Sequence, residues 1–222
     1  MYMHAFSYEK QIFVPIPFLQ YSFFSVTRRY LGEPLNRKWE AKNGDTVSIR
    51  SCWTFGFSDL RVFLAVLRKI QTLRETGGLA TAGEYYDITL VPSDVETLWD
   101  LDRGGSQRNS IRTSLERLQT MFVKIEFGDR SCEARMKGWR KKAVLMVLEN
   151  DESMEKLSGE APDTQWFSES IIARVEQKRS APGFRLLVSK GLADMRSLTV
   201  HLTPVIGLEG DMAKMFALWI QG

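Results

Sequence analysis

Polar side chains that can bind phosphates and base edges recur between residues 109 and 117 at the spacing of one helix face. They are Asn109, Arg112, Thr113, Glu116 and Arg117. Arginine holds phosphate groups, and arginine, asparagine and threonine all donate hydrogen bonds to base edges. The opposite face is apolar at i, i+4, i+7 and i+11, with Ile111, Leu115, Leu118 and Phe122. The pattern predicts an amphipathic helix whose polar face contacts DNA.

Two further residues, Gln107 and Arg108, precede this face and complete the predicted contacts on the helix. Arg108 points nearer the apolar side, and an ion pair with Glu96 or Asp100 is its structural alternative. Either Arg112 or Arg117 is expected to bind a guanine through two hydrogen bonds, which gives roughly 1–3 kcal/mol of base discrimination.

A second basic cluster lies at residues 128–142, a segment that contains six lysines and arginines but only two acidic residues. The strand-like segments 123–127 and 143–148 flank it, and they predict a hairpin with a basic tip. Phosphate contacts are expected from its cationic side chains Lys137, Arg140, Lys141 and Lys142. The alternative is that this is an ordinary solvated hairpin tip. Trp139 is interpreted as the packing anchor of the hairpin.

Two short helices are expected to position these side chains. The first spans 93–101 with Ser93 as its N-cap, and the second spans 106–122 with Ser106 as its N-cap. Gly104 and Gly105 break the chain between them. Two short helices joined by a glycine-containing turn match a helix-turn-helix, and the basic hairpin behind them makes the prediction a winged helix.

The rest of the chain predicts an α+β fold around this unit. A long helix begins after the expected cap Ser58 and buries an apolar stripe consisting of Leu60, Phe63, Leu64, Leu67 and Ile70. Strands are predicted at 45–50, 86–90 and 184–189, and helices at 167–176 (capped by Ser168) and from residue 211 onward. Residues 1–27 predict an edge strand or docked arm. Residues 28–42 and 76–84 predict loops.

Composition is that of a globular protein: 222 residues, 44% hydrophobic, 26% charged, and a net charge of +3. No stretch is long and apolar enough to span a bilayer. Two isolated cysteines suit a reducing cytoplasm, although a disulfide stays open. The chain is divided into an N-terminal arm, 1–44, and a winged-helix domain with a C-terminal helical extension, 45–222.

Catalysis is not expected. The only histidines, His4 and His201, stand far apart, so no paired-histidine metal site accompanies the tyrosines Tyr85 and Tyr86. No phosphate-binding loop of the GxxxxGK[ST] type is present. The spacing of Asp87, Asp94 and Asp100 leaves a nuclease open, but helix capping explains Asp94. The sequence therefore predicts no cofactor and no metal.

The order of elements resembles that of the plasmid replication-initiator (Rep) proteins, and especially the initiators of broad-host-range iteron plasmids. The matching segments are SDLRVFLAVLRKIQ, SDVETLW, GSQRNSIRTSLERLQ, the basic hairpin and GDMAKMFALWI, within roughly residues 22–222. The motif is Ile111, Leu115 and Leu118 with Arg117 between them. The resemblance implies binding to double-stranded origin repeats (iterons), origin opening, a monomer–dimer equilibrium, and contacts with the host initiator and replicative helicase.

The chain departs from that family in one respect. Such initiators usually carry a second winged helix that supplies much of the base contact, and the sequence shows none. Either the chain is the first of two winged helices, or it ends in a docked helix and initiation is in doubt. A winged-helix transcriptional regulator and a pure dimerisation module are the other functions that the sequence leaves open.

Overall fold

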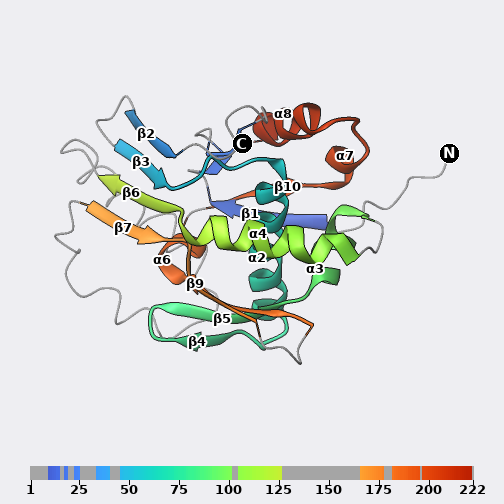
Figure 1. Cartoon of the computed structure of the whole chain (residues 1–222), viewed down its shortest axis with the longest axis horizontal. Helices are drawn as coiled ribbons and strands as arrows, with labels where there is room; N and C mark the ends of the chain where they lie inside the picture. The colour runs from blue at the N-terminus through green and yellow to red at the C-terminus, as the bar shows by residue number, and fades with distance from the viewer. Residues whose placement is uncertain are drawn as a thin grey trace, which may run out of the picture. The chain divides into compact units, whose positions relative to one another are not determined.

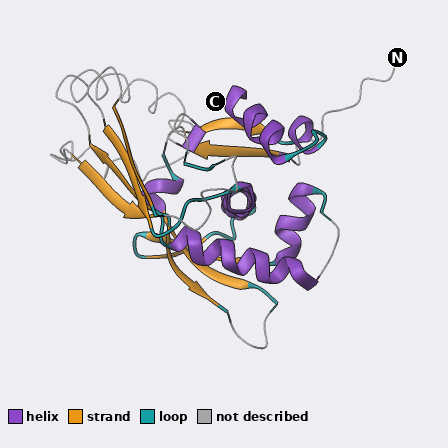
Figure 2. Cartoon of the chain, turned by 45° about the horizontal axis from the view of Figure 1, so that its top comes forward, coloured by secondary structure: helices purple, strands orange, loops and turns teal. Residues whose placement is uncertain are grey.

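The computed structural model describes residues 10–15, 18–19, 23–25, 34–40, 46–101, 105–126, 166–177, 182–195 and 197–221. Helices and strands are mixed without regular alternation, which makes the fold α+β (Figures 1 and 2). Contacts divide the chain into two units. The first is 1–36, 49–122 and 169–222, and the second is 37–48 and 123–168. The predicted division at residue 44 stays a prediction.

The helices and strands follow one another in this order: β1 Gln11–Pro15, β2 Leu35–Glu40, β3 Thr46–Ser51, α2 Phe57–Glu75, β4 Ala80–Ala82, β5 Tyr85–Leu90, α3 Pro92–Trp99, α4 Gly105–Gln119, β6 Phe122–Glu126, β7 Trp166–Ser170, β8 Ile172–Glu176, β9 Phe184–Ser189, α6 Lys190–Ala193, β10 Ser197–His201, α7 Thr203–Ile206 and α8 Asp211–Gln221. The predicted strands at 45–50, 86–90, 123–127 and 184–189 are confirmed within about one residue at each end.

Helix α2 is the centre of the first unit, and its predicted apolar stripe is confirmed as buried. Its start differs from the prediction. Gly56 is the N-cap, and the Asp59 carboxylate accepts a hydrogen bond from the Gly56 N–H at 2.8 Å. Helix α3 repeats the device, because Asp94 accepts from the Val91 N–H at 2.8 Å. Ser58 and Ser93 therefore lie inside their helices, and a carboxylate three residues after the cap replaces the predicted serine.

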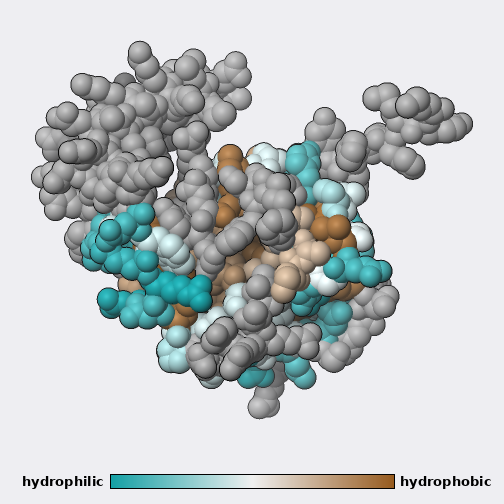
Figure 3. Space-filling view, turned by 90° about the horizontal axis from the view of Figure 1, so that it is seen from above, coloured by the Kyte–Doolittle hydropathy of each residue, from teal (hydrophilic) through white to brown (hydrophobic). Residues whose placement is uncertain are grey.

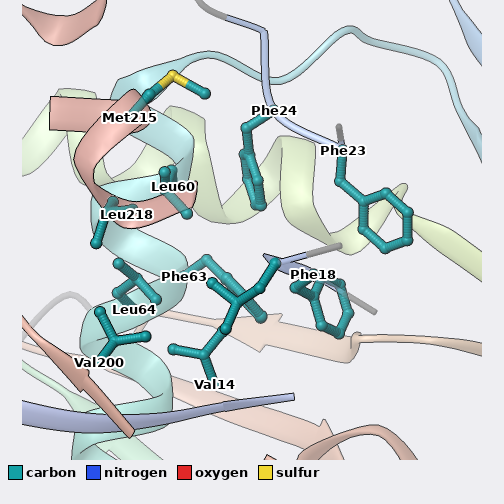
Figure 4. Close-up of a pocket in the computed structure, with 11 residues that line it drawn as sticks. Val14, Phe18, Phe23, Phe24, Leu60, Phe63, Leu64, Val200, Met215 and Leu218 are labelled. Carbon is teal, nitrogen blue, oxygen red and sulfur yellow. The ribbon is translucent and has the colours of Figure 1, made fainter. Parts of the chain in front are cut away.

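The predicted N-terminal strand is confirmed as β1, which pairs antiparallel with β10. Aromatic side chains that follow β1 in the chain fill the space between this pair and α2. The Phe18 ring lies 4.8 Å from that of Phe63 and 5.0 Å from that of Phe23. Val200 of β10 and Leu218 of α8 line the same small apolar pocket (Figure 4). Burial of these side chains holds the two ends of the described chain on α2.

The first unit also contains an antiparallel sheet with strand order β4-β5-β9-β8. Strands β5 and β9 are its two inner strands and pair from Tyr85↔Ser189 to Leu90↔Phe184. Gly183 leads into β9, and a Cβ there would lie 2.9 Å from Thr89 Cγ2 and 3.1 Å from the Leu90 carbonyl oxygen. Only glycine allows the chain to enter the sheet this close to β5.

Several predictions about element type are wrong. Residues 167–176 form β7 and β8 and not a helix capped by Ser168. The predicted loops contain strands β2 and β4. Helix α4 ends at Gln119 and β6 begins at Phe122, so Met121 is buried where Phe122 had been expected in the core. Ser106 lies inside α4, which begins one residue earlier.

The larger part of a four-stranded sheet, ordered β2-β3-β6-β7, belongs to the second unit. Strand β6 lies between β3 and β7 in this order, so both of its edges are paired over the described residues. The sequence predicted that β6 pairs with residues 143–148 in one hairpin, but the neighbours of β6 in the described sheet are β3 and β7. Residues 143–148 themselves lie outside the described residues.

Candidate nucleic-acid interface

Helices α3 and α4 pack together and on α2, as a helix-turn-helix requires. The Trp99 indole N–H donates to the Arg61 carbonyl oxygen at 3.2 Å, and its ring meets that of Phe57 edge-on at 5.5 Å. Asp100 ends α3 in the left-handed conformation with φ 51°. This residue turns the chain away from α3, and α4 begins at Gly105.

The buried side of α4 is the predicted one for three of its four apolar residues. Ile111, Leu115 and Leu118 are at most 3% exposed, and Ser114 joins them. The fourth, Phe122, lies outside the helix and is exposed. With these residues facing inward, the opposite side of α4 is available to a ligand.

That opposite side carries Asn109, Arg112 and Thr113, all exposed as the sequence predicts. Arg112 Nε donates to Glu116 Oε1 at 2.8 Å, one helical turn away. Both side chains are more than half exposed, so the pair contributes little to stability. A phosphate or a guanine edge can therefore compete with Glu116 for the guanidinium.

Arg117 is placed differently from the prediction that it faces solvent beside Arg112. Its side chain is 27% exposed, and its Nη1 lies 3.6 Å from Oδ2 of the fully buried Asp59. Arg117 is three positions after the buried Ser114, so the two side chains point about 60° apart around a helix of 3.6 residues per turn. Arg117 thus stands at the rim of the buried face, and Asp59 of α2 draws its guanidinium inward. The prediction that Arg117 faces solvent together with Asn109, Arg112 and Thr113 is therefore wrong.

Arg108 is exposed and Gln107 is half-buried at the start of α4. With the Gln177 amide oxygen facing it, Arg108 Nε and Nη2 donate to that oxygen at 3.0 and 2.6 Å. Gln177 directly follows β8. The contact ties the first half of α4 to the hairpin formed by β8 and β9.

Two more hydrogen bonds connect the end of α4 to the same region. Gln119 Nε2 donates to the Ala173 carbonyl oxygen of β8 at 3.3 Å, and Ser170 Oγ donates to the Gln119 carbonyl oxygen at 2.9 Å. The β8–β9 hairpin therefore runs beside α4, and Arg174 on it is exposed. The sequence analysis missed this hairpin because it assigned 167–176 to a helix. Strand-like Phe184–Ser189 and the preceding Pro182 and Gly183 were the available signals.

Opposite charges cross the sheet of the first unit at its surface. Arg185 of β9 donates to Asp87 of β5, with Nη2 to Oδ2 at 2.6 Å, and to Glu176 of β8 at 3.2 Å. The hydrogen bonds from Arg185 lower the pKa of the Asp87 carboxyl, and the two carboxylates raise the pKa of Arg185. Asp87 is thus held as a carboxylate by its pairing with Arg185.

The predicted basic contacts Lys137, Arg140, Lys141 and Lys142 lie outside the described residues, as does Trp139. Among the residues that are described, no group of three or more His, Cys, Asp or Glu side chains could hold a metal ion. Of the helices described, none has the length and apolar character needed to cross a membrane.

The backbone is similar to two crystal structures of RctB. One contains domain 2 and domain 3 as selenomethionine derivatives, with a TM-score of 0.49 and 13% identity over 80% of this chain and 60% of that one. The other contains domains 2–3, with a TM-score of 0.42 and 13% identity over 75% of this chain and 53% of that one. This chain spans less than two thirds of either structure. No protein-family model and no curated protein matches the sequence.

Proposed function

We propose that this chain is a winged-helix protein that binds double-stranded DNA sequence-specifically and initiates plasmid replication at repeated origin sequences. The observation that carries the proposal is the outward face of α4. Asn109, Arg112 and Thr113 are exposed together on a helix that packs on α2 and α3, which is compatible with a helix-turn-helix. These are side-chain types that hydrogen-bond to base edges in the major groove.

The β8–β9 hairpin supplies the wing in this proposal. It lies beside α4 and returns to β5, the strand that joins α2 to α3 in sequence. Arg174 is 64% exposed and pairs with Glu176 of the same strand, a carboxylate that a backbone phosphate would have to replace. The connection at 177–183 contains Lys178 and Arg179 in its sequence. The basic segment 128–142 is then a second cationic region, whose Lys137, Arg140, Lys141 and Lys142 add phosphate contacts.

Replication initiation is the biological role that the sequence resemblance to Rep initiators supports. It carries with it self-association, contacts with a host initiator and helicase, and a cytoplasmic location. The chain itself performs no catalysis in this proposal. A winged-helix regulator would use the same α4 face. Direct repeats of about 20 bases beside the gene, two turns of the duplex, favour the initiator, whereas a lone palindrome at the promoter favours the regulator.

The test is a DNA footprint on the upstream region, followed by duplex titrations of Arg112→Ala at several salt concentrations. Losing a base contact from Arg112 is expected to weaken the specific duplex by roughly 5- to 100-fold, and losing a phosphate contact reduces the salt slope by about 1. The matched control is Lys38→Ala, because Lys38 is also an exposed cation paired with a carboxylate of its own element, Glu40. Equal affinities for Arg112→Ala and the unaltered chain would refute the proposed face.

A further inference from the structure

Large hydrophobic side chains that reach the surface of the described residues are few: Phe13, Trp53, Phe122, Leu208 and Met212. Figure 3 shows hydrophobic residues among hydrophilic ones on one face of the molecule. Two of the aromatic rings belong to neighbouring segments. Trp53 is 40% exposed two residues after Ser51, Phe122 is 45% exposed two residues after Thr120, and the hydroxyls of Ser51 and Thr120 lie 2.6 Å apart.

A chain of hydrogen bonds fixes these segments on each other. The Trp53 N–H donates to Ser51 Oγ at 3.2 Å, and Thr120 Oγ donates to the Arg117 carbonyl oxygen at 2.7 Å. Thr120 has one hydroxyl proton and donates it to the Arg117 carbonyl oxygen, so Ser51 must donate to Thr120. The three hydrogen bonds therefore run in one direction, from the Trp53 N–H through the two hydroxyls to the Arg117 carbonyl oxygen. This series orients the turn that carries Trp53.

The Trp53 ring is held from a second side. The Arg117 guanidinium lies over it, 5.9 Å from the ring centroid, at a distance typical of a cation–π contact. The same guanidinium faces Asp59, which is fixed by the Gly56 N–H. The ring is therefore pre-positioned before any ligand arrives, while 40% of the residue stays open to solvent.

We propose that Trp53 and Phe122, with Arg117 over the Trp53 ring, form a stacking site for the unpaired bases of a single DNA strand. Base rings stack on aromatic side chains. A duplex cannot use such rings, because its bases already stack on each other. The site is thus separate from the outward face of α4, and Arg117 acts in it as a positioning residue. The single strand follows from the proposed function, since opening an origin exposes one.

The experiment titrates the full chain with a fluorescein-labelled oligothymidylate of about 20 nucleotides and, separately, with a duplex from its upstream region. Trp53→Ala is expected to weaken oligothymidylate binding by roughly 5- to 100-fold, and Trp53→Phe, which keeps an aromatic face, by less than about threefold. Phe13→Ala is the matched control, because Phe13 is an equally exposed aromatic residue on β1 and keeps the wild-type affinity. Thermal unfolding of each variant verifies that it folds.

Tryptophan fluorescence gives a measurement that does not depend on a folded alanine variant. Stacking quenches the indole, so saturating oligothymidylate is expected to quench wild type more than Trp53→Phe. Wild-type affinity in Trp53→Ala, equal losses in Trp53→Ala and Phe13→Ala, or equal losses for duplex and single strand would each overturn the proposal. If the chain prefers no duplex sequence but Trp53 still governs oligothymidylate binding, the proposed function fails and the stacking site stands.

Discussion

The guanidinium of Arg117 lies 3.6 Å from the carboxylate of Asp59, a residue with no exposed surface. Asp59 also accepts the Gly56 N–H at the start of α2. One carboxylate thus caps α2 and holds the end of α4. Its Oδ1 has no hydrogen-bond partner among the described residues, so the hydrogen bond from Gly56 and the ion pair with Arg117, both to Oδ2, compensate for burying the carboxylate.

Asp59→Ala is expected to destabilise the protein by about 2–4 kcal/mol, because it removes a buried ion-pair partner and the N-cap bond of α2. Asp59→Asn keeps an oxygen for Gly56 and is expected to cost about half as much. Urea unfolding measures both. The control is Asp94→Ala, which removes the equivalent capping carboxylate of α3 and its ion pair with Lys69, but Asp94 is 24% exposed whereas Asp59 is fully buried. A loss no larger for Asp59→Ala than for this control would contradict the role assigned to the buried charge.

The hydroxyl of Tyr86 joins α2 to the end of α6. It donates to Asp194 Oδ2 at 2.6 Å and accepts from Arg74 at 3.0 Å. Burial and the hydrogen bond to Asp194 raise the pKa of Tyr86 above its usual value near 10. A raised folded pKa stabilises the protein below pH about 10, and this contribution disappears as pH rises through the folded value.

Tyr86→Phe is therefore expected to lose roughly 1 kcal/mol at pH 8, the net value of a hydrogen bond. The difference from wild type should shrink as the pH rises above about 10. Urea unfolding at a series of pH values measures it, with Tyr85→Phe as the control for removing one phenol. A difference that stays constant through the alkaline range would show that Tyr86 ionisation is not linked to folding.

Sequence periodicity predicted α2 and the buried face of α4 because both helices bury a single stripe against one partner. It failed at 167–176, where Ile171, Ile172 and Val175 also fit helical spacing. In the structure the chain changes strands at Ile171, whose N–H donates to the Met121 carbonyl oxygen at 3.4 Å. The adjacent Ile171 and Ile172 are both buried at this break, so the segment lacks the alternation of a strand with one exposed face. Residues 172–176 form a strand because they pair with β9, and the local hydrophobic pattern carries no information about that pairing.

In the candidate site, too, the features that depend on the helix alone were predictable, and those that depend on distant residues were not. The exposure of Asn109, Arg112 and Thr113 follows from helical geometry alone. The inward turn of Arg117 depends on Asp59, and the contact of Arg108 with Gln177 depends on the β8–β9 hairpin. Both partners are distant in sequence. Capping failed for a local reason, because a carboxylate at the third helical position can take the place of a serine N-cap.

The end of α4 gives a direct test of where helix changes to strand. Met121 is fully buried and Phe122 is 45% exposed, the reverse of an apolar stripe that continues to Phe122. Met121→Ala is expected to cost about 2–4 kcal/mol and Phe122→Ala less than about 1 kcal/mol. Chemical denaturation of both variants measures the difference. A larger cost for Phe122→Ala would return Phe122 to the core.

The proposed function requires a wing, and two basic segments are candidates for it. The β8–β9 connection contains Lys178 and Arg179, and the segment 128–142 contains Arg140 and Lys141. The hydrogen bond from Gln119 of α4 to Ala173 of β8 favours the first, because a wing must contact the phosphates that flank the groove in which a recognition helix lies. Each double alanine variant removes two cations, so the two variants are matched in charge.

Lys178→Ala with Arg179→Ala is expected to weaken specific duplex binding by roughly tenfold or more and to reduce the salt slope by about 2, with base preference unchanged. Arg140→Ala with Lys141→Ala is expected to have a smaller effect on both. Duplex titrations from low to moderate salt measure the slopes, and competition with a scrambled duplex measures base preference. The opposite ranking would assign the wing to 128–142, where the sequence alone had placed it, and would leave β8–β9 as a structural support of α4.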